Sequence, residues 1–231
     1  MPTSPRLPQP RTAWLAGASG LVGAALLPLL LSSPNYAKVH VLLRRSSALG
    51  AHAAHPRLQV HIVDFARLPA DLPAADDIYI ALGTTIKVAG SEASFRQVDF
   101  DFVVNTARTA RVRGAQRLAV VSSLGANTDS RVFYNRVKGE MQTAIGGLGF
   151  ASVAIAQPSL LLGDRAAIGQ PTRAGEVWMT RLLRPLMGMV PASMRPISAS
   201  SVASALLQAT LAGEPGVHIL TSRAMQIARP S

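Results

Sequence analysis

The chain has 231 residues, of which 48% are apolar, and this is enough to form the buried core of one α/β domain. It contains no cysteine, which excludes disulfides, thiolate metal sites and a cysteine nucleophile. The formal net charge of +11 comes from twenty arginines and three lysines against twelve acidic residues. Because no basic run is longer than Arg44-Arg45, we expect no specific nucleic-acid partner, although the charge favours anionic ligands such as phosphates. His52 and His55 lie close in sequence, but nothing nearby completes a metal set, so no metal is expected.

An uncharged stretch from Thr12 to Ser33 follows Arg6 and Arg11, as in a signal peptide or a membrane span. The glycines of residues 17–23 would weaken a spanning helix, and removing the stretch would delete a strand and a helix that the fold needs. We therefore expect no membrane span and a cytoplasmic protein. Residues 1–11 are expected to form a disordered tail, since the first ten residues include four prolines.

Short apolar runs alternate with helical stretches, a pattern typical of a parallel sheet covered on both faces. The expected strands are apolar nearly throughout, as strands buried on both faces must be. They are Ala13–Ala16, Val39–Leu43, Leu58–Val63, Ile78–Leu82, Leu118–Ser122, Ser152–Ala156 and, later in the chain, Val217–Leu220. The expected helices are Leu21–Leu31, which Pro28 should kink or end early, Ser94–Arg113, Arg131–Ile145 and one near Ser201–Leu211. The sequence thus predicts an α/β fold with a doubly wound parallel Rossmann sheet.

The pattern loosens after residue 157, where prolines recur. We expect a single domain over residues 12–231, in which residues 157–231 form a small irregular cap over a substrate site. The large apolar side chains of this cap could line a pocket for a small molecule, although most are expected to pack on the sheet. They are Trp178, Met179, Leu183, Met187, Met189 and Met194.

A glycine motif stands between the first expected strand and the helix after it. Its residues are Gly17, Ala18, Ser19, Gly20, Leu21, Val22 and Gly23. Gly17 would allow a tight turn, Gly20 would let backbone N–H groups approach a pyrophosphate, and Gly23 would permit close packing of helix and strand. The motif therefore predicts a dinucleotide site, with a packing helix rich in glycine and alanine as the alternative.

The second expected strand ends in Arg44 and Arg45, where a site that selects NAD usually has an acidic residue for the ribose hydroxyl. A guanidinium suits a 2′-phosphate, so we predict NADP(H) as the cofactor, with two exposed arginines of no function as the alternative. Asp64 and Phe65 follow the third strand as neighbours of an adenine. Residues 82–84 (Leu82, Gly83 and Thr84) end the fourth strand, where backbone could pass close to a cofactor.

Tyr134 and Lys138 are four residues apart on one expected helix, so the ammonium lies near the phenol and favours its ionised form. The strand before this helix ends in Ser122 and Ser123, and a serine there can bond a substrate carbonyl while Tyr134 delivers a proton. These residues predict an acid/base site made of Ser123 (or Ser122), Tyr134 and Lys138. An ordinary Tyr/Lys pair on a helix is the alternative.

The segments GASGLVG, LGTT, VVSSLGA, YNRVKGE and QPSLLLGDR, in this order, resemble the atypical short-chain dehydrogenases/reductases related to the Tat-interacting protein. Bacterial members of that group are often described as epimerase-like or NAD(P)H-binding proteins. The resemblance is close over residues 12–165 and looser afterwards. Many extended members have Asn where this chain has Asp99, and Asp before the helix that here begins near Ser200-Ser201.

The resemblance implies a role for each motif residue. Gly17 to Gly23 would hold the pyrophosphate, and Arg44 and Arg45 the 2′-phosphate. Tyr134 would be the acid/base, Lys138 its partner and a ribose ligand, and Ser123 (or Ser122) the hydroxyl that polarises the substrate. Three further residues, Pro158, Ser159 and Leu160, would lie along the nicotinamide.

The expected reaction is hydride transfer from NADPH to the carbonyl carbon of a small substrate, in a monomer or homodimer. Sugar-nucleotide epimerases usually have more residues after the sixth strand than this chain has. This difference favours a substrate smaller than a nucleotide sugar. Two other functions stay open. One is a regulatory protein that binds NADP(H) without catalysis, and the other is a nucleotide-sugar epimerase or dehydratase.

Overall fold

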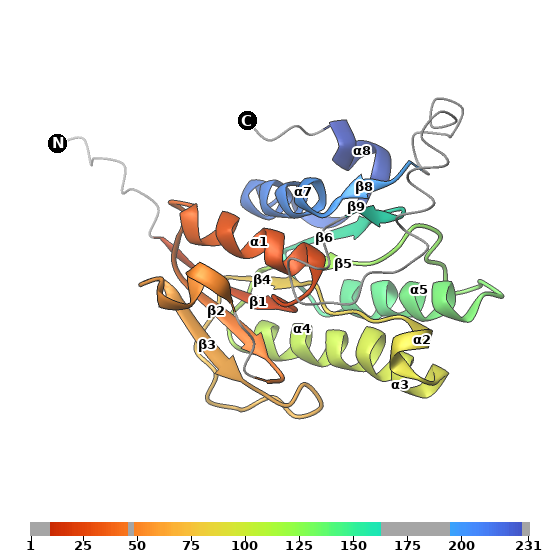
Figure 1. Ribbon diagram of the computed structural model, residues 1–231, viewed down its shortest axis with the longest axis horizontal. Coiled ribbons are helices and arrows are strands. Elements are labelled where there is room, and N and C mark those ends of the chain that lie inside the picture. Colours follow the sequence, from red (N-terminus) through yellow and green to blue (C-terminus); the bar gives the residue numbers. More distant parts are fainter. Residues whose placement is uncertain (1–9, 46–48, 163–194, 228–231) are drawn as a thin grey trace.

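The computed structural model describes residues 10–45, 49–162 and 195–227. Its main sheet has seven strands in the order β3-β2-β1-β4-β5-β6-β9, and every neighbouring pair is parallel (Figure 1). These strands are β1 (Arg11–Ala16), β2 (Tyr36–Leu43), β3 (Leu58–Ile62), β4 (Asp77–Ile80), β5 (Arg117–Val121), β6 (Ser152–Gln157) and β9 (Gly216–Thr221). Two short strands, β7 (Leu161–Leu162) and β8 (Ile197–Ser198), pair with each other. The predicted Rossmann sheet is confirmed.

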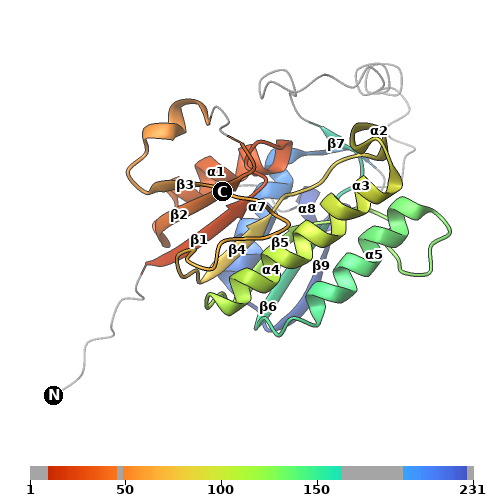
Figure 2. The same ribbon diagram turned by 90° about the horizontal axis from the view of Figure 1, so that it is seen from below.

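Helices cover both faces of the sheet. Helices α1 (Leu21–Ser32) and α7 (Ala199–Ala212) lie on one face, and α4 (Phe102–Val112) and α5 (Phe133–Gly146) lie on the other (Figures 1 and 2). The core is accordingly split into two layers. In β1, Leu15 packs in the layer under α1, whereas its neighbour Trp14 packs in the layer under α4. Successive strand residues face opposite sides, so a strand in the middle of such a sheet must be apolar at every position.

The chain turns to different faces after β1 and after β4. From β1 the strand order runs to β2 and β3 on one side, and from β4 it runs to β5 and β6 on the other. The order therefore reverses between β1 and β4, and the helices that follow these two strands, α1 and α4, lie on opposite faces. In doubly wound sheets, ligands bind in the crevice at the carboxyl ends of the strands at this point. The predicted motifs at residues 17–23 and 82–84 flank it.

The edge strands differ from the expectation that every strand is buried on both faces. Val60 and Ile62 of β3 are 45% and 56% exposed, and Val217 and Ile219 of β9 are 50% and 44% exposed. The reason is that the helices cover the middle of the sheet, and an edge strand has a neighbour on one side only. An apolar run alone does not distinguish an edge strand from a central one.

The prediction that residues 1–11 form a tail is wrong at Arg11, which is the first residue of β1. Its guanidinium lies 3.2 Å from a carboxylate oxygen of Asp77, which is fully buried, and 5.4 Å from the Tyr36 ring centroid. Asp77 also pairs with Arg117 at 3.1 Å and accepts a hydrogen bond from the Tyr36 hydroxyl at 2.6 Å. A buried carboxylate is costly unless cations compensate it, and this ion pair holds Arg11 in the strand.

Two helix predictions are corrected. Helix α1 continues through Pro28 to Ser32 instead of ending early, because buried leucines on both sides of the proline hold it against the sheet. The expected helix Ser94–Arg113 consists of α3 (Glu92–Arg96), a π-helical turn η2 (Gln97–Asp101) and α4. Wide turns of this kind are frequent at functional sites. Here the turn carries Asp99, which is buried.

The remaining elements are short, apart from α7. They are η1 (Gly50–Ala54), α2 (Ile86–Ala89) and α8 (Ser222–Ile227), none of which the sequence predicted. Helix α7 confirms the expectation near Ser201–Leu211, and Ser198 caps it by accepting the Ser201 N–H at 3.0 Å. The apolar cap residues between Trp178 and Met194 lie outside the described residues. Within the described part of the chain, no helix is both long enough and apolar enough to cross a bilayer.

A histidine pair between β2 and β3 makes stability depend on pH. Nδ1 of His40 lies 2.9 Å from Nε2 of His61, and burial lowers the pKa of His40 to about 4 from 6.5. A lowered pKa in the folded state means that stability is complete above pH 6.5 and falls as the pH drops toward 4. We expect a loss of about 2–3 kcal/mol over this range.

His40→Asn can keep a polar contact with His61 but does not titrate, so it should reduce this dependence. Part of it should remain, because burial also lowers the pKa of His61. Urea unfolding of both proteins at about pH 7.5 and about pH 4.5 measures the effect. Equal losses of stability in the variant and the wild type would place the acid-sensitive group elsewhere.

Candidate cofactor and catalytic site

The turn between β1 and α1 leaves no space for side chains at two of its glycines. Gly17 has a φ of +91°, and a Cβ atom there would lie 2.5 Å from the carbonyl of Ala81. A Cβ atom on Gly23 would lie 2.0 Å from the carbonyl oxygen of Gly17. A Cβ atom on Gly20 would lie 3.4 Å from its nearest neighbour, the carbonyl oxygen of Gly17. Gly17 and Gly23 are therefore required by packing, and Gly20 keeps the outer side of the turn open.

The start of α1 offers backbone rather than side chains. Gly20 is its N-cap, and the first turn has no acidic residue. No acidic side chain in that turn therefore neutralises the positive end of the helix dipole. Ala18 and Val22 are buried in the core, whereas Ser19 is exposed. Backbone N–H groups at a helix N-terminus can bind an anion such as a phosphate.

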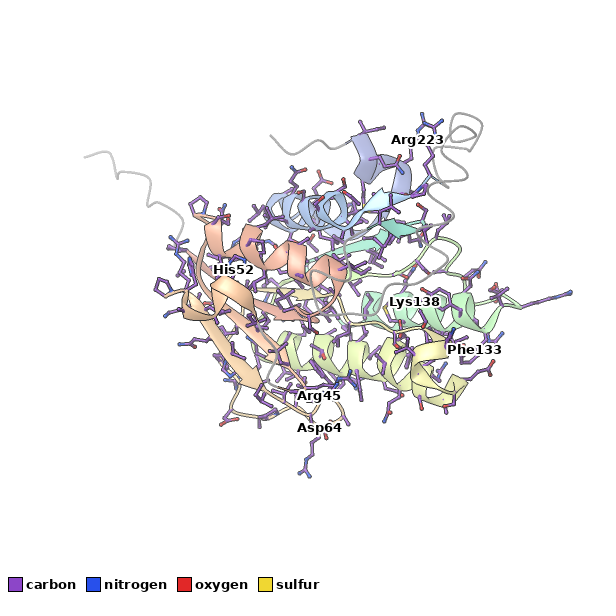
Figure 3. The ribbon with its side chains drawn as sticks, viewed as in Figure 1. Arg45, His52, Asp64, Phe133, Lys138 and Arg223 are labelled. Carbon is purple, nitrogen blue, oxygen red and sulfur yellow. The ribbon has the colours of Figure 1, made fainter. Side chains whose placement is uncertain are left out.

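The ends of β2 and β3 lie side by side, because the N–H of Val63 donates to the carbonyl of Leu43 at 2.8 Å. Arg44 and Arg45 follow β2 with exposed side chains, and Asp64 follows β3, also exposed. Figure 3 shows the side chains of Arg45 and Asp64. The Phe65 ring is only 2% exposed and packs 6.1 Å from the ring of Phe102. Contact between Phe65 and an adenine would therefore involve the backbone of Phe65 and not its ring.

The segment after β4, residues 81–84, is hydrogen-bonded to the end of β1 on one side and to η2 on the other. The N–H of Ala81 donates to the carbonyl of Ala16 at 2.8 Å, and the N–H of Thr84 donates to Oδ2 of Asp99 at 2.8 Å. A Cβ atom on Gly83 would lie 3.3 Å from Oδ1 of Asp99 and 3.9 Å from Nζ of Lys138. The sequence-predicted residues Gly83 and Lys138 are thus brought together.

The two serines after β5 have different surroundings. Oγ of Ser122 accepts a hydrogen bond from the Gln142 amide at 2.5 Å, and that amide in turn accepts one from Gln157 at 3.1 Å. Oγ of Ser123 is buried and has no hydrogen-bond partner among the described residues. Of the two candidates, Ser123 has the hydroxyl that is available to a further ligand.

Helix α5 supplies the tyrosine and the lysine. Tyr134 lies in its first turn, with its ring 5.2 Å from that of Phe95. Lys138 is 3% exposed, and its Nζ lies 2.8 Å from Oδ1 of Asp99 (Figure 3). A Cβ atom on Gly139 would lie 2.3 Å from the backbone of Asn127, so the loop after β5 lies directly on this helix.

The segment after β6 closes the other side of the loop that holds Ser123. The carbonyl of Pro158 accepts the N–H of Leu124 at 2.9 Å, and the hydroxyl of Ser159 donates to the carbonyl of Arg195 at 2.5 Å. The carbonyl of Leu160 accepts the N–H of Ile197 at 2.9 Å. These residues connect the sheet edge to the start of the region that was predicted to form the cap.

Three residues of this region had no role in the sequence prediction. Asp99 was only a departure from related sequences, Gly139 was only part of the segment YNRVKGE, and Gln142 belonged to no motif. A signal for Gln142 was present, because residues 134, 138 and 142 recur at intervals of four on one face of α5. The contact of Gly139 with the backbone of Asn127 joins segments that sequence spacing does not relate.

The glycine turn gives a test of this geometry. We expect Gly23→Ala to destabilise the protein by at least about 3 kcal/mol, because its Cβ atom would overlap the Gly17 carbonyl. Gly20→Ala is the matched control and should cost less than about 1 kcal/mol, since it meets nothing within 3.4 Å. Urea unfolding measures both. Equal stabilities for the two variants would contradict the close packing at Gly23.

Sequence comparisons identify relatives over most of the chain. Residues 17–146 match the NAD(P)H-binding family. Protein HTATIP2 of Rattus norvegicus is 33% identical over 176 residues, which are 75% of this chain and 70% of that protein. The protein fmp52 of Aspergillus fumigatus is 32% identical over 186 residues, covering 78% of this chain and 77% of the relative.

Solved structures share the fold at low sequence identity. A short-chain dehydrogenase/reductase oxidoreductase from Burkholderia thailandensis superposes with a TM-score of 0.67 at 18% identity, over 94% of both chains. MoeE5 in complex with UDP-glucose and NAD gives a TM-score of 0.67 at 17% identity, over 90% of this chain and 75% of that one. At such identities the likeness shows the fold alone.

The relatives also correct one prediction and settle the family. The fmp52 proteins of Aspergillus fumigatus, Candida albicans and Eremothecium gossypii are named mitochondrial, which contradicts the expectation of a cytoplasmic protein. That expectation rested on dismissing a targeting role for the N-terminal stretch, and sequence composition does not decide this point. From the family match and the identity to HTATIP2, the chain belongs to the NAD(P)H-binding family that includes HTATIP2 and the fmp52 proteins.

Proposed function

We propose that the protein is an NADP(H)-dependent oxidoreductase of the short-chain dehydrogenase type, acting on a small carbonyl or alcohol substrate. The observation that carries this proposal is the buried hydroxyl of Ser123, which has no partner among the described residues. A buried donor without a partner is costly unless a ligand satisfies it. A substrate oxygen would do so, on the same loop that packs against the helix of Tyr134 and Lys138.

The residues present fit a nicotinamide dinucleotide. The open side of the turn at Gly20, the start of α1 and the segment at Gly83 together provide backbone without side chains in the way. Arg44 and Arg45 would bind a 2′-phosphate, and Asp64 with the backbone of Phe65 would lie beside the adenine. Lys138 would hold the ribose, and Pro158 to Leu160 would lie along the nicotinamide ring.

When bound, the cofactor supplies or accepts a hydride at the substrate carbon. In the reducing direction, the phenol of Tyr134 would donate its proton to the substrate oxygen, so that the substrate becomes an alcohol and Tyr134 a tyrosinate. The hydroxyl of Ser123 donates to that oxygen and orients the carbonyl. The ammonium of Lys138 stabilises the tyrosinate. Oxidation of an alcohol runs through the same groups in reverse.

Cofactor preference is the first test. We expect NADPH to bind at least about tenfold more tightly than NADH, and Arg44→Ala/Arg45→Ala to weaken NADPH binding by about 100-fold while leaving NADH unchanged. The matched control is Lys38→Ala/Arg223→Ala, which removes two exposed positive charges away from the end of β2. Calorimetric titration measures all three proteins.

An equal loss of NADPH affinity in the control and in the arginine variant would show that the effect comes from net charge and not from contacts of Arg44 and Arg45 with the phosphate. Failure of the wild type to bind either nucleotide would contradict the proposal as a whole.

The catalytic roles are tested by three substitutions. Tyr134→Phe should lower kcat by a factor of about 10²–10⁴ while NADPH affinity stays within about threefold, because only the transferred proton is lost. Ser123→Ala should lower kcat by about 10–100-fold, and Ser122→Ala, whose hydroxyl is already bound by Gln142, by much less. Turnover of a panel of small aldehydes and ketones, followed by NADPH absorbance, provides the assay.

A larger loss for Ser122→Ala than for Ser123→Ala would reverse the two serine roles. Tight NADPH binding by a wild type that turns over no member of the panel would favour a protein that binds NADP(H) without catalysis.

A further inference from the structure

Ser222 is a buried serine at the start of α8, a helix to which the proposed reaction gives no role. The residue is 0% exposed, and α8 packs against α7 and β9 (Figure 1). Its Oγ lies 2.9 Å from Oγ of Ser159, although the two residues are 63 positions apart in the sequence. Ser159 belongs to the segment after β6 that is proposed to lie along the nicotinamide. Helix α8 thus contacts the back of one wall of the proposed site.

The directions of the hydrogen bonds around Ser159 follow from the single proton that a hydroxyl can donate. The hydroxyl of Ser159 donates to the carbonyl of Arg195, so in its contact with Ser222 the donor is Ser222. Oγ of Ser222 in turn accepts an N–H of the Gln226 amide at 3.3 Å, and this amide also donates to the carbonyl of Arg195 at 3.1 Å. The four groups form a closed ring of hydrogen bonds, which holds the side chain of Ser159 in one orientation.

The backbone on either side of Ser159 is attached to two other segments. The carbonyl of Pro158 accepts the N–H of Leu124, in the loop after β5, and the carbonyl of Leu160 accepts the N–H of Ile197. The side chain of Ser159 is a third attachment between these two, and it leads to α8. Removing the donor on α8 would therefore let the segment shift while both of its backbone bonds remain.

We propose that Ser222 is a positioning residue, which acts through Ser159 to fix the wall of the site along the nicotinamide. Its own position is set by packing, because Met225 of the same helix is 1% exposed and lies in the core layer of α1 and α7. Hydride transfer needs the ring and the substrate carbon at a fixed distance, so a wall that shifts lowers both affinity and rate. This role rests on the proposed function, which places the nicotinamide beside residues 158–160.

Two nucleotides separate this role from a general effect on the fold. NADPH carries the nicotinamide, whereas adenosine 2′,5′-bisphosphate carries only the adenosine half with its 2′-phosphate. We expect Ser222→Ala to weaken NADPH binding about five- to tenfold and to leave the affinity for adenosine 2′,5′-bisphosphate within about twofold of wild type. Calorimetric titration with each nucleotide measures both affinities, and no turnover is needed.

Two further variants serve as controls. Ser222→Thr keeps the donor and adds a methyl group in a buried place, so it should retain the wild-type ratio of the two affinities at a cost in stability. Thr210→Val removes another buried hydroxyl, which donates to the carbonyl of Leu206 at 2.8 Å near the end of α7. Because α7 ends where β9 begins, Thr210 lies at the opposite edge of the sheet, and this variant should also leave the ratio unchanged.

A double-mutant cycle tests whether Ser222 acts through Ser159. In that case Ser159→Ala/Ser222→Ala should bind NADPH within about twofold of Ser159→Ala alone, because the second change removes a donor whose acceptor is already gone. Additive losses in the double variant would overturn the inference. Equal weakening of both nucleotides by Ser222→Ala, or an unchanged affinity for NADPH, would do the same.

Gln226→Ala decides the question if Ser222→Ala does not fold, because Gln226 is only half-buried. It removes the amide that donates to Ser222 and should weaken NADPH about two- to threefold, with adenosine 2′,5′-bisphosphate unaffected. An unchanged ratio of affinities in this variant overturns the role of Ser222 while normal NADPH binding by the wild type leaves the proposed function intact. Failure of the wild type to bind NADPH would overturn both.

Discussion

Three backbone segments meet at the carboxyl end of β1 so closely that a side chain has no space between them. The carbonyl of Gly17 lies against α1 at Gly23, and the Cα of Gly17 lies against the carbonyl of Ala81 at the end of β4. This contact sets how α1 leaves the sheet and how near β4 lies to β1. The crevice where the strand order reverses is a consequence of that approach, and so is the open backbone at Gly20.

A second layer of contacts, made by polar side chains, arranges the groups beyond that crevice. Gln142 and Gln157 occupy the hydroxyl of Ser122, so the neighbouring Ser123 is left with a buried hydroxyl that has no partner in the described chain. Asp99 holds the backbone of Thr84 and the ammonium of Lys138 at the same time. Buried polar groups of this kind rigidify a site only when each is satisfied, and a ligand would satisfy the hydroxyl of Ser123.

Most of the sheet could be predicted from the sequence, because the central strands are runs of apolar residues that stop within three residues of their observed ends. Glycine spacing likewise predicted the turn at Gly17. The choice between Ser122 and Ser123 could not be made, because it depends on Gln142, twenty residues away. The two contacts of Asp99 and the start of β1 at Arg11 were missed for the same reason, because each depends on a contact between distant segments. Location was predicted wrongly, since composition does not report where a protein is targeted.

We propose that the nicotinamide cofactor binds across the carboxyl ends of β1 and β4. Amide hydrogen exchange, followed residue by residue with and without NADPH, tests it most directly. Slower exchange is expected at Gly20 to Gly23 and at residues 82–84 when NADPH is present, because the ligand would cover these N–H groups. Little change is expected at the exposed edge strand β9. Unchanged exchange at both segments, with protection elsewhere on the sheet, would contradict it.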